Sequence, residues 1–441
     1  APLMVLSNKE INREALAEYY LTRACRAPNT VFSDIHELKA GEALVFDLDT
    51  FAIKSISRWA PLRTASRTIT DEAEAIALLD RVINQAIDSH LVADVPVATL
   101  LSGGVDSSLI TALAAKRNPD INAFSLGFRD TRFDESGYAA ALCQKAGIKH
   151  HVLMSDAAEF LDVIEQWPLV MDDPVADPSA VMLYKIAQFA RDKGFKVVLS
   201  GEGADELFGG YNQYGRFNRA LQYKNIGRFL GLLPLFVKTA FPAKTRHVHY
   251  LKQLTTDPHY YGTGMIVEPY LLGNLCRGVN GTTFPKVATF SDALLFDQEN
   301  RLPDDLLTRT DRATMHASIE ARVPFLTPYL GDAAASIDTG LLIKGGVRKY
   351  ILKKYSEAFV PHDNLYRPKV GFDLPLAGWF RGTLKSYVLD NLSSTWQGDY
   401  LHKPALQKMA DEHMSGKNNN ADKLWAFALL ENNVRQLKQI V

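Results

Sequence analysis

Residues 101–108 read LSGGVDSS and stand between a strand-like run and a helix-like run. Residues 97–101 (VATLL) are apolar except for Thr99, which is typical of a short strand buried on both faces of a parallel sheet. Residues 107–115 have the spacing of a helix. A strand that turns through glycines into a helix marks the edge where α/β proteins bind ligands. This stretch therefore predicts both the fold class and the position of a binding site.

Strand and helix patterns continue to alternate on the carboxyl side of this stretch. Residues 123–128, 151–154 and 196–199 are strand-like, and residues 135–146, 157–167 and 181–191 are helix-like. Such alternation implies right-handed βαβ crossovers, so we predict an α/β fold with a parallel sheet and helices on both faces. After about residue 210 the strand signals fade, and we expect a mostly helical carboxyl-terminal part.

Residues 1–60 predict a small α+β segment. Ser7 and Glu10 fit an S-x-x-E capping box ahead of a helix at 11–21, and residues 43–47 and 51–56 predict a hairpin. One helix and one hairpin do not form an independent core, so this segment must pack on something else or end a larger domain. Residues 61–70 (PLRTASRTIT) are typical of a linker, and residues 71–441 are expected to form the main domain.

The composition argues against several classes of protein. The 441 residues carry 49 Lys and Arg against 50 Asp and Glu, a balance that speaks against a nucleic-acid-coating or anionic-membrane protein. The three cysteines are far apart, which favours free thiols in a reducing compartment. No apolar run could span a bilayer and no signal-peptide pattern opens the chain, so we expect a cytoplasmic protein. Because the chain begins with Ala1, we expect a numbering that starts inside a longer gene product or at a processed end.

Each residue type in SGGVDSS suits the binding of a phosphate. Gly103 and Gly104 allow a tight turn that brings backbone N–H groups against an anion, and the following helix points its amino-terminal dipole at the same place. Hydroxyl donors come from Ser102, Ser107 and Ser108. Asp106 would repel a bare phosphate, which suggests a bridging Mg²⁺. The stretch lacks the lysine of a Walker A loop, and a plain glycine-rich turn capped by Ser and Asp stays the alternative.

A second stretch, residues 200–211 (SGEGADELFGGY), follows the strand-like run 196–199. It should lie on the same carboxyl edge of the sheet as the first loop. Glu202, Asp205 and Glu206 place three carboxylates within five positions, which is unfavourable in a cleft unless a metal or a cationic group is close. The alternative is a solvated acidic loop, or carboxylates at a helix amino terminus.

These stretches resemble known families. SGGVDSS resembles the signature of the PP-loop ATP pyrophosphatases, whose loop holds the pyrophosphate portion of ATP. Residues 200–211, together with 172–180 (DDPVADPSA), 309–326 (RTDRATMHASIEARVPFL) and 366–375 (YRPKVGFDLP), resemble the asparagine synthetase family. The resemblance implies an adenine nucleotide alpha hydrolase-like fold for residues 71–441. It also implies that residues 1–60 are the last part of an Ntn-type glutaminase domain.

The resemblance also implies a role for individual residues. The pyrophosphate-loop positions are Ser102, Gly103, Gly104, Asp106, Ser107 and Ser108. Asp106 and Asp205 match the two carboxylates for Mg²⁺, and Glu202 matches an acidic residue at the reacting centre. The remaining nucleotide contacts are the adenine-flanking Leu100 and Leu126 and the backbone of Ser200 and Gly201. Lys369 in RPKVGF matches a loop lysine that neutralises the developing adenylate and pyrophosphate charge.

The implied activity is ATP-dependent formation of an amide. A carboxylate substrate, aspartate or an analogue, is adenylated with release of pyrophosphate, and ammonia or an amine then gives the amide and AMP. A glutamine-dependent member needs an amino-terminal nucleophilic cysteine, whereas residue 1 is Ala1 and the first cysteine is Cys25. The chain should therefore not hydrolyse glutamine. Its nitrogen would be free ammonia, ammonia from a separate or missing glutaminase domain, or an amine on the substrate.

Other interpretations stay open at this point. Another PP-loop enzyme, such as a tRNA-modifying or a GMP- or NAD-forming synthetase, is disfavoured by residues 200–211 and 366–375 and by the lack of an RNA-binding module. A synthetase of a natural-product or peptide-cyclising pathway, or a non-catalytic nucleotide-binding homologue, would share the motifs. We expect no nucleic-acid and no membrane partner, and we leave a homodimer open.

Overall fold

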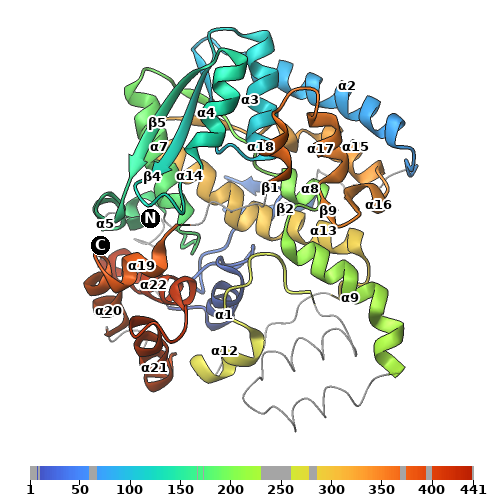
Figure 1. The fold of residues 1–441 in the computed structure, drawn as a ribbon. Helices are drawn as coiled ribbons and strands as arrows, with labels where there is room; N and C mark the ends of the chain where they lie inside the picture. Colours follow the sequence, from blue (N-terminus) through green and yellow to red (C-terminus); the bar gives the residue numbers. More distant parts are fainter. Residues whose placement is uncertain are drawn as a thin grey trace.

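The structure is a computed structural model that describes Ser7 and residues 10–58, 67–165, 167–171, 173–229, 260–277, 286–367, 374–393 and 400–439. Its centre is a parallel five-stranded sheet in the order β5-β4-β3-β6-β7. The strands are β3 (Val97–Leu100), β4 (Asn122–Phe128), β5 (Lys149–Ser155), β6 (Val197–Leu199) and β7 (Glu320–Arg322). Helices cover both faces of the sheet (Figure 1). The predicted α/β fold is confirmed.

Alternate residues of the central strands β3, β4 and β6 enter two different cores, which is why these strands read as continuous apolar runs. In β3, Val97 belongs to the core under α2 (Glu72–His90), α3 (Val105–Arg117) and α4 (Ser136–Ala146). Its neighbour Ala98 faces the opposite core. That core is formed with α5 (Ala157–Ile164), α6 (Trp167–Val170), α7 (Ser179–Asp192) and the carboxyl-terminal helices.

The connections create a topological switch point between β3 and β6. From β3 the chain passes through α3 to β4 and through α4 to β5, moving outward on one side. It then returns through α5, α6 and α7 to β6, on the other side of β3. At such a point the loops that leave two neighbouring strands turn toward opposite faces of the sheet, and ligands of α/β proteins bind at this carboxyl edge. Both sequence motifs lie in the loops that leave β3 and β6.

The part of the chain after β6 is mostly helical, as predicted. Its elements up to β7 are α8 (Ala204–Phe208), α9 (Asn212–Phe229), α12 (Pro269–Leu275), α13 (Phe290–Glu299), the π-helical η3 (Leu302–Leu307) and α14 (Thr308–His316). After β7 come η4 (Pro324–Leu326), α15 (Pro328–Ser336), α16 (Thr339–Leu342), the short strands β8 (Ile343–Lys344) and β9 (Val347–Arg348), and α17 (Tyr350–Ser356). The last helices are α18 (His362–Tyr366), α19 (Leu376–Arg381), α20 (Lys385–Ser393), α21 (Lys403–Met414) and α22 (Ala421–Gln439).

The sequence did not predict β7, because three residues are too short for a strand pattern. Its Glu320 and Arg322 form an ion pair with a 2.7 Å distance between Nε and Oε1. Arg322 also donates to the carbonyls of His90, the last residue of α2, and of Val92, which follows the helix. Arg322 thus fastens the outer strand of the sheet to the end of α2.

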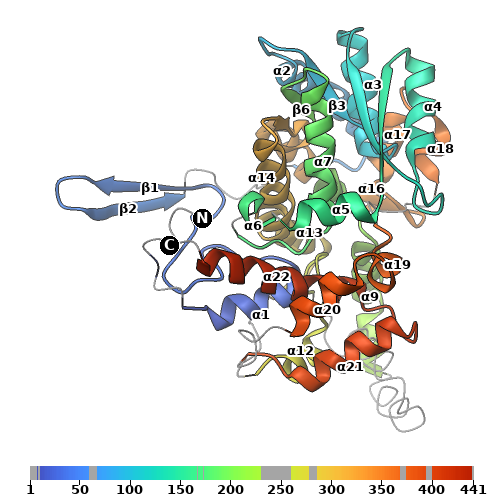
Figure 2. The same cartoon turned by 90° about the vertical axis from the view of Figure 1, so that its left-hand side faces the viewer.

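The amino-terminal segment packs on the carboxyl-terminal helices through α1 (Arg13–Thr22), whose Tyr19 donates to the carbonyl of Ala426 in α22. The predicted capping box was wrong. Asn12 caps α1 by accepting from two backbone N–H groups, because it stands directly before the first turn, whereas the hydroxyl of Ser7 donates to Asp34. The hairpin of β1 (Glu42–Asp47) and β2 (Ala52–Arg58) projects from the body (Figure 2). Residues 61–66 of the predicted linker lie outside the described residues.

Candidate active site

The first loop is shaped by glycine and by the start of α3. Gly103 has a φ of +74°, and a Cβ there would lie 2.9 Å from the Cβ of Tyr138, so the turn requires glycine. Gly104 is the N-cap of α3, which places Asp106 and Ser107 in the first turn. Their backbone N–H groups are among the four that a helix leaves unbonded at its start. The loop therefore offers an anion site at a helix amino terminus.

The serines of this loop are arranged for donation. The hydroxyls of Ser102 and Ser107 are hydrogen-bonded to each other at 3.0 Å, so the two side chains converge on one place. Ser108 is fully buried, and its hydroxyl has no hydrogen-bond partner within the described part of the chain. An unsatisfied buried hydroxyl is costly, and a phosphate oxygen at the start of α3 would satisfy it.

Glycine brings the second loop against the first. A Cβ at Gly201 would lie 2.9 Å from the backbone nitrogen of Ser107 and 3.0 Å from the Cβ of Asp106. Ser200, just after β6, donates its N–H to the carbonyl of Arg322 at 2.8 Å, which fixes the start of the loop on β7. The structure thus places the two predicted motifs in contact at the switch point.

A buried lysine joins the two loops. Lys349 Nζ lies 2.6 Å from both carboxylate oxygens of Asp106 and 2.7 Å from Oδ1 of Asp205. Burial alone would lower the pKa of Lys349, but the two carboxylates outweigh it and raise the pKa, so the ammonium stays charged. Lys349 precedes α17 with a φ of 51°, a left-handed conformation that costs a lysine backbone energy.

Sequence reasoning missed Lys349. Three clustered carboxylates called for a metal or a cationic group, and the structure supplies the cation from a position 144 residues after Asp205, the difference between 349 and 205. The only local signal is a basic pair after two glycines, GGVRKY at 345–350, which is typical of many surface turns.

A second cation orients the predicted reacting-centre carboxylate. Arg309 in α14 donates from Nη2 to Glu202 at 2.9 Å, and its Nη1 lies 2.8 Å from Asp177. Although burial opposes both charges, the facing guanidinium lowers the pKa of Asp177, and the facing carboxylates raise the pKa of Arg309. Glu202 keeps a side chain that is 22% exposed, so it can reach a substrate while Arg309 holds it.

The other predicted positions take different places. Leu100 is the last residue of β3 and Leu126 lies in the carboxyl-terminal half of β4, and both pack on the same core. Glu206 is buried against Tyr211, whose hydroxyl donates to it at 2.6 Å, and burial together with Asp205 raises its pKa to about 7. Lys369 lies outside the described residues, so its role stays a prediction.

The residues present fit Mg²⁺. Two carboxylates, those of Asp106 and Asp205, converge on a single ammonium between the loops. Mg²⁺ in nucleotide sites is commonly held by one or two carboxylates together with substrate phosphates and water. The described residues contain no cluster of three or more His, Cys, Asp or Glu side chains that could hold a metal by itself. The donor set therefore suits a metal that comes with phosphate oxygens.

The chain also matches known proteins. A family model described as asparagine synthase matches residues 78–435. The chain belongs to the asparagine synthase family. It is 30% identical over 445 residues to "Asparagine synthetase [glutamine-hydrolyzing] 1" of Bacillus subtilis, a match that covers 97% of this chain and 69% of that protein. It is 29% identical over 377 residues to "Asparagine synthetase [glutamine-hydrolyzing] 3" of the same organism, covering 81% and 58%.

Family membership makes the chain an ATP-dependent, amide-forming ligase of the asparagine synthetase type. A solved structure of the U34-tRNA thiolase NcsA from Methanococcus maripaludis covers 71% of this chain and 93% of its own, with 14% identity and a TM-score of 0.25. That score is too low to support any conclusion. Within the described residues, no helix is long and apolar enough to cross a membrane.

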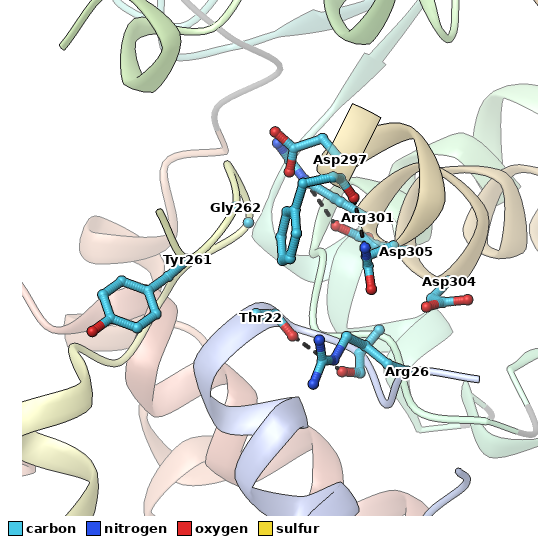
Figure 3. A pocket seen from close by; sticks show the side chains of 12 residues that line it. Thr22, Arg26, Tyr261, Gly262, Asp297, Arg301, Asp304 and Asp305 are labelled. Atoms are coloured by element: carbon cyan, nitrogen blue, oxygen red, sulfur yellow. Dashed lines mark hydrogen bonds and ion pairs between the residues drawn. The ribbon is translucent and has the colours of Figure 1, made fainter. Parts of the chain in front are cut away.

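A separate small cavity lies between α1 and η3. It measures about 20 Å³, which is room for about one water molecule, and Figure 3 shows Arg26, Arg301, Asp297, Asp304 and Asp305 around it. Burial and the neighbouring Glu37 raise the pKa of Asp304 to about 8. The cavity shows that the amino-terminal segment meets the rest of the chain through charged groups as well as apolar ones.

Proposed function

We propose that this ligase activates a carboxylate substrate, aspartate or an analogue, by adenylation and then converts it to an amide. The observation that carries the proposal is the convergence of Asp106 and Asp205 on Lys349, between a glycine loop at a helix amino terminus and a loop that presents Glu202. Acidic and cationic groups at a switch point suit a reaction in which negative charge develops on the leaving pyrophosphate and must be stabilised.

In the first step, a substrate carboxylate oxygen attacks the α-phosphorus of ATP. The bond from that phosphorus to the oxygen bridging it to the β-phosphorus breaks, and pyrophosphate leaves with the electron pair. The N–H groups of Gly104 and of the first turn of α3, with the hydroxyls of Ser102 and Ser107, face the charge that grows on pyrophosphate. Leu100 and Leu126 would flank the adenine, and Ser200 and Gly201 would contact the nucleotide through their backbones.

Lys349 is suited to pair both with the carboxylates of the two loops and with the phosphate oxygens of the nucleotide. Its ammonium pairs with Asp106 and Asp205, and it lies at the place to which phosphate oxygens would come. Mg²⁺ held by the two carboxylates would neutralise the charge on the phosphate oxygens. Lys369 would add positive charge from the segment that follows Arg367. Together these groups would stabilise the leaving pyrophosphate.

In the second step, ammonia or an amine attacks the acyl carbon and AMP leaves. The nitrogen loses a proton, and Glu202 can accept it or orient the nucleophile. Arg309 would hold Glu202 in place for this role, because its Nη2 lies 2.9 Å from Glu202 while its Nη1 lies 2.8 Å from Asp177.

We propose that no cysteine of this chain releases the nitrogen from glutamine. Cys25, Cys143 and Cys276 are all buried, and burial raises the pKa of each thiol. None of them can act as an exposed thiolate nucleophile on glutamine. Free ammonia, ammonia from a separate glutaminase, or a substrate amine would each serve the second step.

We also propose that residues 1–60 end a glutaminase-type domain and 71–441 form the synthetase domain. The cross-strand pairs Leu44–Ile56 and Phe46–Ile53 of the β1–β2 hairpin are exposed apolar side chains. A two-stranded hairpin with an uncovered apolar face is marginally stable alone. The names of the Bacillus subtilis relatives describe glutamine hydrolysis, which supports a covering domain of that kind.

Carboxylate-dependent exchange of labelled pyrophosphate into ATP tests the first step without any nitrogen donor. We expect exchange with aspartate or with one member of a panel of related carboxylates, and AMP release when ammonia is added. Asp106→Asn should abolish both. Absence of exchange with every carboxylate, in protein shown to bind ATP, would contradict the adenylation mechanism. Exchange with a carboxylate other than aspartate would contradict only the choice of aspartate.

A further inference from the structure

A buried asparagine of α18 is hydrogen-bonded to the backbone of the first loop. Asn364 is 3% exposed, and its side-chain amide donates to the carbonyl of Gly103 at 3.1 Å and to the carbonyl of Tyr138 at 3.0 Å. Gly103 lies in the pyrophosphate loop and Tyr138 in the first turn of α4. One side chain therefore ties three separate segments together.

The grip on Gly103 fixes the direction of the next N–H group. The peptide between Gly103 and Gly104 is planar and trans, so its C=O and its N–H point in opposite directions. When Asn364 holds the carbonyl of Gly103 on the buried side, the N–H of Gly104 must face the other way. The N–H of Gly104 indeed points to the side of the serine hydroxyls, where it donates to Oγ of Ser102 at 3.4 Å, and that hydroxyl is hydrogen-bonded to Ser107. Asn364 thus determines where the N–H of Gly104 points.

Glycine makes this control necessary. Gly103 has a φ of +74°, and the flanking glycine at 104 adds no side chain that could fix the peptide plane. A Gly-Gly peptide can rotate at low cost, and a rotation would turn the N–H of Gly104 out of the site. The two hydrogen bonds of Asn364 remove that freedom, since rotation would leave a buried carbonyl unsatisfied.

The same short helix is fastened at its end. Arg367, three residues after Asn364, forms an ion pair with Glu135, and its guanidinium lies 4.2 Å from the ring centroid of Tyr138. Both partners belong to the start of α4, the segment that Asn364 also grips. Lys369 follows two positions later in the sequence. The segment that leads to Lys369 is therefore built onto the back of the pyrophosphate loop.

We propose that Asn364 is a positioning residue for pyrophosphate binding, which aims the N–H of Gly104 at the phosphate through its hydrogen bond to the carbonyl of Gly103. This inference rests on the proposed function of the first loop as the pyrophosphate site. It adds a residue that touches neither ATP nor the acceptor carboxylate. It also predicts a specific signature in nucleotide binding that a purely structural role would not produce.

The test is Asn364→Leu, with Asn364→Ala in case the larger side chain prevents folding. Calorimetric titration would measure the affinity for ATP with Mg²⁺ and for pyrophosphate, neither of which needs an acceptor. We expect both affinities to fall roughly tenfold, the value of one misdirected hydrogen bond to an anion. KM for ATP and the inhibition constant of pyrophosphate should rise by the same factor, while KM for the carboxylate and for ammonia stays unchanged.

Asn433→Leu is the matched control. Asn433 is also fully buried and also donates its amide to a backbone carbonyl, that of Met171 at 3.2 Å, but it belongs to α22 in the other core. Its loss should lower stability and leave ATP and pyrophosphate affinities as they are. A folding defect reduces the active fraction, and hence kcat, without changing an affinity or an inhibition constant. Unchanged ATP and pyrophosphate affinities in the Asn364 variants would overturn the proposal, and an unreactive wild type that still binds ATP would overturn only the proposed reaction.

Discussion

Replacing Lys349 by methionine should create a protein whose stability depends on Mg²⁺. Methionine keeps most of the buried stem but removes the ammonium that lies 2.6 Å from Asp106 and 2.7 Å from Asp205. Removing one partner of a buried ion pair typically costs about 3–5 kcal/mol, because the remaining charge stays buried without compensation. Here two carboxylates lose their shared partner, so we expect a loss of about 3–5 kcal/mol in the free energy of unfolding at neutral pH. Whole domains have only about 5–15 kcal/mol.

Mg²⁺ should restore much of this loss. A cation that binds the folded state at a concentration 100 times its Kd adds about 2.7 kcal/mol. Millimolar Mg²⁺ should therefore stabilise Lys349→Met by roughly 2–3 kcal/mol, whereas in the wild type the ammonium already occupies the carboxylates and the gain should stay under about 1 kcal/mol. Urea unfolding followed by tryptophan fluorescence, in EDTA and in MgCl2 at matched ionic strength, measures both values.

Lys344→Met is the control for this experiment. Lys344 also pairs with a carboxylate, Glu72 at 2.9 Å, but at the surface, where the lysine side chain is 50% exposed. Its replacement should cost at most about 1 kcal/mol and create no response to Mg²⁺. An equal response of wild type and Lys349→Met to Mg²⁺, or a loss below about 1 kcal/mol, would refute the reasoning that these carboxylates form a cation site.

Four further changes have defined outcomes. Lys369→Ala should lower kcat about 10²–10³-fold in the exchange assay with little change in ATP affinity, and unchanged turnover would exclude its charge-stabilising role. Arg309→Met should lower kcat for amide formation at least about tenfold, because Glu202 loses its guide; equal activity of variant and wild type across pH would show that Arg309 only packs. Asp304 holds its proton in the folded state up to a pKa of about 8, so stability should fall as pH rises from about 4 to 8, and Asp304→Asn should gain roughly 1–3 kcal/mol over wild type at pH 8.5 relative to pH 5 in urea unfolding. The double substitution Leu44→Lys and Ile56→Lys should reduce self-association measured by light scattering and leave ammonia-dependent turnover unchanged. Unchanged self-association would mean that the apolar face of the hairpin does not mediate it.

The fold was predictable where side-chain periodicity is set by burial. Strands β3, β4 and β6 are buried on both faces, so their apolar runs stand out in the sequence and their limits came within a residue or two. Strand β7 was missed because it has three residues and takes its place by pairing with β6, a long-range contact that leaves no local pattern. The N-cap of α1 was misplaced because a capping box and a single Asn12 compete, and the backbone turn decides between them.

The site divides in the same way. The meeting of the two loops that leave β3 and β6 was predictable, because the carboxyl ends of neighbouring parallel strands lie at one edge of the sheet. Lys349, Arg309 and Asn364 were not, since each lies on a helix or turn far along the chain and reaches the loops only through tertiary packing. The sequence indicated that a cation or a metal must lie near the three carboxylates, but it did not indicate which residue supplies the cation.

The identity of that cation bears on the order in which ligands should bind. If Lys349 already neutralises Asp106 and Asp205, free Mg²⁺ must displace a buried ammonium with no compensating anion, which makes binding of the metal alone unfavourable. Mg²⁺ that arrives with ATP brings phosphate oxygens, and these give the displaced ammonium a new partner. The wild type should therefore bind Mg²⁺ and ATP together more tightly than it binds either ligand alone. Because Lys349→Met lacks the ammonium, it should lose this coupling and bind free Mg²⁺ while binding ATP more weakly.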